Sequence, residues 1–301
     1  MSAKEFFTKG WPTRLGFQLA RYIPPRGGNL IAAFAARLIV TTKPDMYRAA
    51  RANLRHVVGP DVSDAELGRM AHRLFLNVCR GYYELFHNVS CGEVRVENFH
   101  PPVLLTPEAR TYFRQALDSG RGLFILGCHM SNFDLGGIGM SQYIPAELQA
   151  LSLASPPPGF EFFNRLREMG HGIVTPITPR TLRDAMARLR AGGVVLTGVD
   201  RPIGEGNEPV EFFGATAYLP AGYIRIPLKT DCLVVTVSFI YEDGVYWILA
   251  NPPMEMERTG DRQQDIAINL RRVLAQIEAF IRRAPEQWMM FVPVWKDDDG
   301  D

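Results

Sequence analysis

The residues best suited to catalysis lie in the stretch GLFILGCHMSNFDLGG, which runs from Gly122 to Gly137. An apolar segment ends there at His129, and Asp134 follows five residues later. A carboxylate that accepts the Nδ1 proton of a histidine fixes the tautomer of the ring and leaves Nε2 free to deprotonate a hydroxyl. The pair therefore predicts a general base with an orienting acid. A structural histidine held by a nearby carboxylate is the alternative.

Spacing by itself does not identify this pair, because His56 and Asp61 have the same separation. Context favours His129, which comes two residues after a short apolar strand, where ligands gather in α/β sheets. Five residues along one helix would place the two side chains about 140° apart. They meet only if the chain bends between them, and Asn132, a good helix N-cap, predicts that bend.

Other catalytic groups fit this stretch less well. Cys128 adjoins His129, but neighbouring residues of a strand point to opposite faces, which disfavours a Cys–His nucleophile. One histidine and one carboxylate fall short of the three protein ligands of a catalytic zinc ion, so we expect no metal. The four cysteines are widely spaced and form no Cys-x-x-Cys unit, which favours a reducing, cytosol-facing location.

The composition is that of an ordinary globular protein, but the charge is unevenly distributed. Residues 1–60 carry ten Lys and Arg residues and two acidic ones, so a net charge of +1 for the whole chain leaves the remainder near −7. These basic residues alternate with the apolar segments GFQLARYI and NLIAAFAARLIV, as in helices that lie on anionic membranes. We expect amphipathic, membrane-docking helices over residues 1–60 and a catalytic domain over residues 61–301. Ordinary packed helices with a solvated basic face are the alternative.

Three further features are expected to be absent. The first twenty residues lack the pattern of a cleavable signal peptide. The longest apolar runs are too short to span a bilayer. The basic residues are not interleaved with the aromatic or glycine-rich motifs of the common nucleic-acid modules, so we expect no nucleic-acid partner.

The order of elements predicts an α/β fold. Capping signals at Ser63, Thr106 and Thr178 predict helices. The last two helices end at glycines that precede the fully apolar strands GLFILG and VVLTG, and such strands are typical of a mostly parallel or mixed sheet flanked by helices. The segments CLVVTVSFIY and VYWILA predict a hairpin at the edge of that sheet. A long helix is expected from Asp261 to Arg283.

Several segments together resemble a known family. HMSNFDLGG is similar to the His-x-Gly-Asn-Trp-Glu-Leu signature of the bacterial lipid A biosynthesis acyltransferases, the lauroyl and myristoyl transferases, and of the related phosphatidylinositol mannoside acyltransferase. Ser131 replaces the Gly of that signature, Phe133 the Trp and Asp134 the Glu. Five more segments resemble the family in the same order: RAARANLRHV, FNRLREMGHGIV, LRAGGVVLTGVDRP, VEFFGATAYLPAG and PEQWMM.

The resemblance implies roles for particular residues. His129 would be the general base and Asp134 its orienter, while backbone N–H groups near Asn132 would stabilise the oxyanion. Glu211 would be a second carboxylate at the histidine, and Glu208 is close enough in sequence to take that role instead. The implied substrate-binding residues are Asn132, Arg167, Asp200 and Arg201. Arginines suit phosphate groups, and Arg165 cannot face one ligand together with Arg167 on a helix.

The resemblance also implies the glycerolipid acyltransferase fold and a reaction. A fatty acyl group would pass from acyl-carrier protein or acyl-CoA to a hydroxyl of a membrane glycolipid or phospholipid, with no cofactor. The protein would lie peripherally on the anionic cytoplasmic face of the inner membrane. A lysophospholipid acceptor is the runner-up, although the Phe-Pro-Glu-Gly-Thr-Arg motif of the glycerol-phosphate acyltransferases is absent. A non-catalytic, acyl-lipid-binding peripheral membrane protein is the third possibility.

Overall fold

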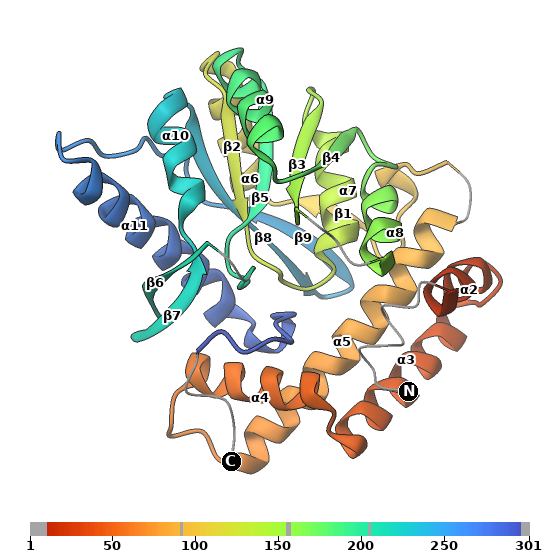
Figure 1. The fold of residues 1–301 in the computed structure, drawn as a ribbon. Helices are drawn as coiled ribbons and strands as arrows, with labels where there is room; N and C mark the ends of the chain where they lie inside the picture. Colours follow the sequence, from red (N-terminus) through yellow and green to blue (C-terminus); the bar gives the residue numbers. More distant parts are fainter. Residues whose placement is uncertain (1–10, 91–92, 155–157, 204–205, 296–301) are drawn as a thin grey trace.

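A seven-stranded sheet forms the centre of the protein in the computed structural model, which describes residues 11–90, 93–154, 158–203 and 206–295 (Figure 1). The strand order is β1-β9-β8-β2-β5-β3-β4. All neighbouring strands are parallel except β8 and β9. The strands are β1 (Val103–Leu105), β2 (Leu123–Gly127), β3 (Leu148–Ser152), β4 (Gly172–Pro176), β5 (Val194–Gly198), β8 (Leu233–Glu242) and β9 (Val245–Ala250). The predicted α/β class with a mostly parallel mixed sheet is confirmed.

Helices cover both faces of this sheet (Figure 1). One apolar core joins the sheet to α9 (Pro179–Arg190), α10 (Arg225–Thr230), α11 (Arg262–Arg283) and a separate hairpin of β6 (Asn207–Phe212) and β7 (Ala215–Pro220). A second core joins the other face to α6 (Pro107–Asp118), α7 (Phe133–Tyr143) and α8 (Pro158–Arg167). Successive β2 residues enter opposite cores: Phe124 and Leu126 face one, and Leu123 and Ile125 face the other. This alternation explains why the strand reads as continuously apolar.

The helices begin where the capping signals predict. Thr106 accepts a hydrogen bond from the N–H of Ala109 at 3.1 Å, and Thr178 forms a reciprocal capping box with Thr181. Ser63 accepts from the N–H of Glu66 at 3.2 Å at the start of α5 (Asp64–Ser90). Asp261 caps α11 in the same way. Side-chain acceptors satisfy N–H groups that have no partner within the helix, and this explains the observed helix starts.

The hairpin of β8 and β9 forms as predicted, but its expected place at the edge of the sheet is wrong. β8 lies beside the central strand β2, and β9 pairs in parallel with β1, which forms the edge. The first eight residues of β8 are all buried, as both faces of a central strand must be. β1 has three residues, too few for the alternation of apolar and polar side chains that would predict a strand.

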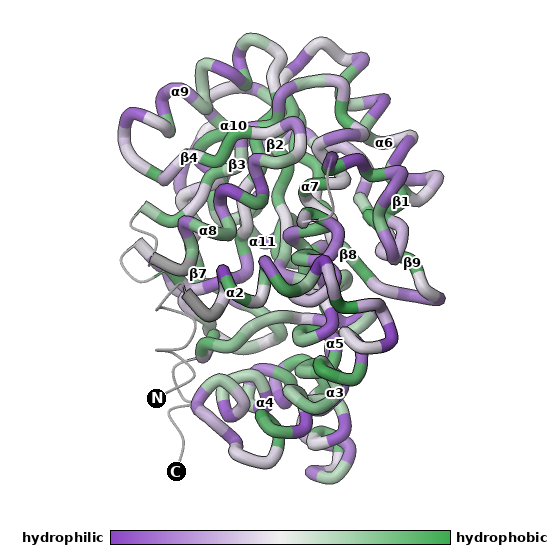
Figure 2. The backbone as a smooth tube through the Cα atoms, turned by 90° about the vertical axis from the view of Figure 1, so that its right-hand side faces the viewer, coloured by the Kyte–Doolittle hydropathy of each residue, from purple (hydrophilic) through white to green (hydrophobic). Residues whose placement is uncertain are grey.

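The N-terminal helices lie at one end of the molecule (Figures 1 and 2). They are α2 (Trp11–Ala20), α3 (Pro25–Thr42) and α4 (Asp45–Val58), and all three contact the long helix α5. Gly28 allows the close approach of α3, because a Cβ at this position would lie 2.2 Å from the ring of Tyr83 on α5. Residues 1–10 of the predicted docking region lie outside the described residues. No described helix combines the length and apolarity needed to cross a membrane.

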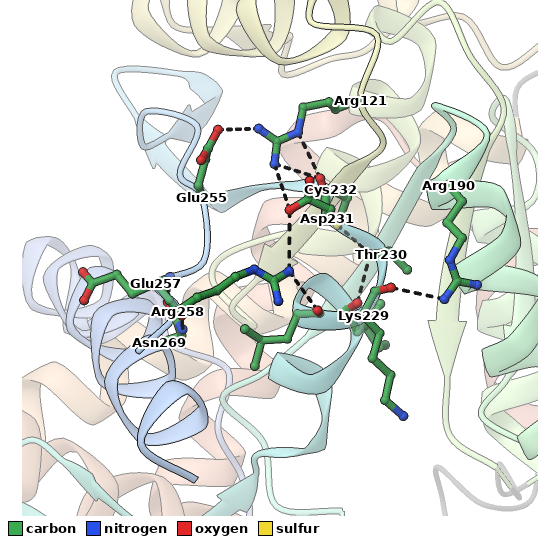
Figure 3. Close-up of polar contacts among 12 residues, drawn as sticks. Arg121, Arg190, Lys229, Thr230, Asp231, Cys232, Glu255, Glu257, Arg258 and Asn269 are labelled. Carbon is green, nitrogen blue, oxygen red and sulfur yellow. Dashed lines mark hydrogen bonds and ion pairs between the residues drawn. The ribbon is translucent and has the colours of Figure 1, made fainter. Parts of the chain in front are cut away.

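A cluster of arginines lies at the end of the sheet where β2 begins, away from the N-terminal helices (Figure 3). Arg121 donates to the carbonyl of Asp231 at 2.8 and 2.9 Å, Arg190 to that of Lys229 at 3.1 Å, and Arg258 to that of Leu228 at 2.9 Å. These carbonyls lie at the C-terminal end of α10, where helix carbonyls lack partners and cations are favourable. The arginines therefore attach α10 to its neighbours.

Candidate active site

The register of the sheet brings His129 and Asp200 together. β2 and β5 are parallel neighbours in which Gly127 lies opposite Gly198, and each polar residue comes two positions after its glycine. The Nδ1 atom of His129 lies 2.6 Å from Oδ1 of Asp200, and the backbone N–H of His129 donates to Oδ2 at 2.9 Å. Asp200, for which the family resemblance implied a substrate-binding role, is thus the carboxylate that contacts the histidine.

Asp134 does not make the contact that its spacing predicted. The expected bend exists, because Ser131 has a φ of +51° and Asn132 caps α7 through the N–H of Leu135 at 3.2 Å. However, the helix begins immediately after Asn132, and the Asp134 carboxylate accepts from Nε of Arg167, the last residue of α8, at 2.7 Å. The bend therefore places the carboxylate beside an arginine instead of the histidine.

The electrostatic setting keeps His129 neutral near pH 7. Burial, together with the positive charge of Arg201, lowers the pKa of the imidazole below its ordinary value, although Asp200 opposes this shift. Burial works against ionisation of Asp200, but the adjacent histidine and its hydrogen bonds outweigh burial and lower the pKa of the carboxyl group. An ionised Asp200 accepts the Nδ1 proton, so Nε2 is left as the basic atom. No described residue forms a hydrogen bond with this Nε2.

A cavity of about 190 Å³ opens beside His129, between α7 and strands β3, β4 and β5. Its wall includes Leu148 and Ser152, the first and last residues of β3, so it extends along the whole strand, roughly 13 Å. Most of the wall is apolar, with Phe160, Ile173, Leu196 and Phe239 among the larger side chains. His129 and the charged groups Asp134, Arg167 and Arg201 lie toward the carboxyl ends of the strands, whereas the hydroxyl of Ser141 lies near the start of β4. The cavity is thus a long apolar channel that meets a charged site at His129.

The two arginines of the site differ in their partners. Arg167 is bound to Asp134 and donates to Asn164 at 2.8 Å. Arg201 donates to the carbonyl of Met289 at 3.1 Å and forms no ion pair with any residue in the described ranges. Burial of this guanidinium lowers its pKa, although the carboxylate of Asp200 opposes the shift. Arg201 is therefore a half-buried cation at the cavity with charge available for an anionic ligand.

The remaining predicted residues occupy different places. Asn132 is buried, and its amide donates to the carbonyl of Gly81 at 2.9 Å, so its side chain fixes the loop to α5. Glu211 is exposed on β6, and Glu208 pairs with Arg225 at 3.1 Å. Among the described residues, the carboxylate bonded to the His129 ring is that of Asp200, so neither glutamate makes the contact expected of a second acid. Arg165 is exposed on α8.

Helix α7 offers N–H groups beside the histidine. Its first residue, Phe133, packs edge to face on the His129 ring with the ring centres 4.9 Å apart. The N–H of Leu135 is bound by the Asn132 side chain, and that of Gly136 by the Asn132 carbonyl. The N–H groups of Phe133 and Asp134, in the first turn, have no acceptor within the helix. These two groups, aided by the helix dipole, suit an anion formed near His129.

Two functional features were missed by reasoning from the sequence. The pairing of Asp200 with His129 could have been found from the parallel segments LFILGCH and VVLTGVD, in which a polar residue follows each strand at the same offset. The second is Trp288, whose indole N–H donates to Oδ2 of Asp200 at 2.8 Å. No pattern in the sequence linked this tryptophan to Asp200. The described residues contain no group of three His, Cys, Asp or Glu side chains placed to hold a metal ion.

Two comparisons relate this chain to known proteins. The curated phosphatidylinositol mannoside acyltransferase of Mycolicibacterium smegmatis is 23% identical over 189 residues. The matched region covers 62% of this chain and 60% of that protein, so the chain spans less than two thirds of the relative. The profile of the bacterial lipid A biosynthesis acyltransferases matches residues 6–297. Because this match covers nearly the whole chain, the protein belongs to the bacterial lipid A biosynthesis acyltransferase family, whose acyl transfer acts on lipids.

Proposed function

We propose that this protein transfers a fatty acyl group from an acyl thioester, on acyl-carrier protein or coenzyme A, to a hydroxyl of a membrane glycolipid or phospholipid. The observation that carries the proposal is the His129–Asp200 pair at the charged end of a long apolar cavity. The cavity suits the hydrocarbon chain of the donor, because its wall is mostly apolar along the length of β3. The thioester carbonyl then lies near His129.

The reaction requires one proton transfer in each direction. Nε2 of His129 removes the proton from the acceptor hydroxyl while the oxygen attacks the thioester carbonyl, which forms a C–O bond and a tetrahedral oxyanion. The oxyanion collapses, the C–S bond breaks, and the protonated histidine returns its proton to the leaving thiolate. Asp200 holds the ring through Nδ1 and stabilises the transient imidazolium. The N–H groups of Phe133 and Asp134 are the proposed oxyanion donors.

The arginines are proposed to position the anionic parts of the substrates. Arg201 has no carboxylate partner among the described side chains and lines the cavity, so it suits a phosphate of the acceptor or donor. The charge of Arg167 is already balanced by Asp134. We therefore assign Asp134 to the placement of Arg167, and Asn132 to the fixing of the loop, in place of direct roles in proton transfer. Glu211 receives no role in this mechanism, because it is exposed on β6.

We also propose that α2 and α3 hold the protein peripherally on an anionic membrane surface, at the cytoplasmic face of the inner membrane. The arrangement of α3 supports this, because its small residues are buried and its large apolar residues are exposed. The buried residues are Gly28, Ala32 and Ala36, and the exposed ones are Leu30, Ile31, Phe34 and Leu38. Residues 11–44 contain five basic residues and no acidic one. Such a surface suits both acyl chains and anionic headgroups.

Replacement of His129 by Ala tests the proposed reaction. Purified protein would be incubated with acyl-CoA or acyl-carrier protein and a panel of acceptors that includes glycolipids and lysophospholipids. Thioester loss and lipid acylation would be followed together. We expect acyl transfer to fall at least about 10²- to 10⁴-fold in His129→Ala, since a general base contributes this much. His171→Ala, which removes an exposed imidazole outside the site, is the control.

The outcomes separate the candidate functions. Transfer only to lysophospholipids would replace the glycolipid acceptor with the runner-up. Tight lipid binding without thioester loss in any acceptor mixture would identify a non-catalytic lipid-binding protein. Wild-type turnover by His129→Ala would contradict the general-base mechanism.

A further inference from the structure

The segment that follows α11 lies directly across the loop that carries His129. The carbonyl of Gln287 accepts from the N–H of Ser131 at 2.6 Å, and the N–H of Met289 donates to the carbonyl of His129 at 2.8 Å. Met130 and Trp288 form an antiparallel bridge between these two bonds. A short two-stranded contact thus fixes the backbone on either side of the histidine, although the two segments are far apart in sequence.

Trp288 adds a side-chain contact to this arrangement. It is 1% exposed, and its indole N–H donates to Oδ2 of Asp200, which is itself fully buried. Among the described residues, Asp200 has three donors: the Nδ1–H of His129, the backbone N–H of His129, and this indole. Only the indole is independent of His129. Without it, the carboxylate would be oriented by the same residue that it must orient.

We propose that Trp288 is a positioning residue for acyl transfer, which fixes the Asp200 carboxylate through its indole N–H and thereby sets the orientation and basicity of His129. The proposal rests on the general-base role proposed for His129. Trp288 touches neither substrate in this scheme and acts through Asp200. Its backbone bridge to Met130 places the indole in register with the loop, so one segment fixes both the histidine backbone and its acid.

The direction of the effect on His129 follows from the groups around the pair. Arg201 and Arg167 are the cations that face it. Cys128 and Tyr223 are also close, and burial raises the pKa of each, so both stay neutral near pH 7. The indole shares the negative charge of Asp200 with Nδ1–H of the histidine. Without the indole, the Asp200 carboxylate interacts more strongly with the protonated imidazole. The pKa of His129 should therefore rise.

Trp288→Phe is the direct test, because it keeps an aromatic ring and removes the N–H. We expect kcat/KM to fall about 10- to 100-fold, the range for a lost hydrogen bond to a charged group. The fall should lie mainly in kcat, with KM little changed. The acid limb of the pH profile should also move to higher pH, because a more basic His129 loses its proton later. A merely structural role would lower activity without this shift of the profile.

Trp295→Phe is the matched control. Trp295 is as deeply buried, belongs to the same aromatic cluster, and donates its indole N–H to the carbonyl of Phe212 at 3.3 Å. In the described part of the chain its indole N–H bonds to the Phe212 carbonyl and not to Asp200, so its replacement tests loss of ring area and of a buried N–H without touching the pair. We expect the pH profile of Trp295→Phe to match that of the wild type. An equal shift in both variants, or none in Trp288→Phe, would overturn the proposal.

A measurement on wild-type protein covers the case in which Trp288→Phe fails to fold. The chain has four tryptophans, so the indole N–H resonances can be followed individually by ¹H–¹⁵N NMR. The Trp288 signal should move as His129 titrates, and this movement should be absent in His129→Ala. A Trp288 signal that ignores this titration would refute the coupling. Because no acyl transfer is needed, the experiment also separates a failure of this inference from a failure of the proposed reaction.

Discussion

Exchange of two exposed apolar residues on α3 for serine should weaken membrane binding. Leu30 and Phe34 are each 73% exposed and lie one turn apart on the face of α3 that points away from α5. Full burial of such a side chain contributes about 1.5–3 kcal/mol. Because about three quarters of each side chain is available for burial in a membrane, the two together should contribute roughly 3 kcal/mol to binding. This corresponds to about 10²-fold weaker partitioning of Leu30→Ser/Phe34→Ser into a bilayer. In Figure 2, hydrophobic stretches run through α3 at the end of the molecule away from α9.

Flotation with vesicles of defined composition would measure this change. Wild-type protein should bind anionic vesicles better than zwitterionic ones, and added salt should weaken binding, since each basic residue near an anionic surface contributes about 1 kcal/mol. Leu104→Ser/Val292→Ser is the matched control, because it removes two exposed apolar residues outside α2 and α3. Equal flotation of the α3 double variant, the control and the wild type would refute docking through this surface. Equal binding by a folded variant that lacks residues 1–42 would refute it as well.

Three further substitutions test other parts of the site and its support. Gly198→Ala would place a Cβ 2.8 Å from Cε1 of His129, so we expect kcat to fall by about 10² while Gly68→Ala, with open space around it, changes little. Arg201→Ala should raise the KM of the phosphate-bearing substrate about tenfold or more, whereas the replacement of the exposed Arg165 by Ala should leave it unchanged. Equal KM values in Arg201→Ala and the wild type would reject the anion site. Burial raises the pKa of Glu84 to about 7 from 4.5, so folded protein holds a proton that unfolded protein releases, and wild-type stability falls as pH rises from about 4.5 to 7. The free energy of unfolding, measured in urea, should differ between pH 5 and pH 8 by about 1–3 kcal/mol less in Glu84→Gln than in the wild type. An unchanged difference would place the titration elsewhere.

The sequence predicted those elements whose signals are local. The caps at Thr106 and Thr178 and the fully apolar strands specify helix starts and buried strands within a few residues, and they agree with α6, α9, β2 and β5. The strand order depends on pairing between distant segments, and no local pattern records it. For this reason the sequence predicts the β8–β9 hairpin but not its place between β1 and β2.

The site shows the same division between local and non-local information. The position of His129 after a strand and the cap at Asn132 were both readable, because each depends on a few consecutive residues. The acid that contacts His129 depends on the register of β2 against β5, which brings together residues 71 positions apart in the chain. The predicted bend at Asn132 makes Asp134 a candidate for this contact, but the immediate start of α7 directs its carboxylate to Arg167.

The charges around the cavity suggest why two carboxylates and two arginines are needed for one base. With His129 neutral, the negative charges of Asp200 and Asp134 balance the positive charges of Arg167 and Arg201, so these four described residues together carry no net charge. Removal of the acceptor proton makes the imidazole positive at the step in which the thioester oxygen becomes negative. The site then carries one positive charge only while the oxyanion exists, which favours the transition state over the bound substrates. Burial, which lowers the pKa of His129, keeps the resting imidazole unprotonated and preserves this difference.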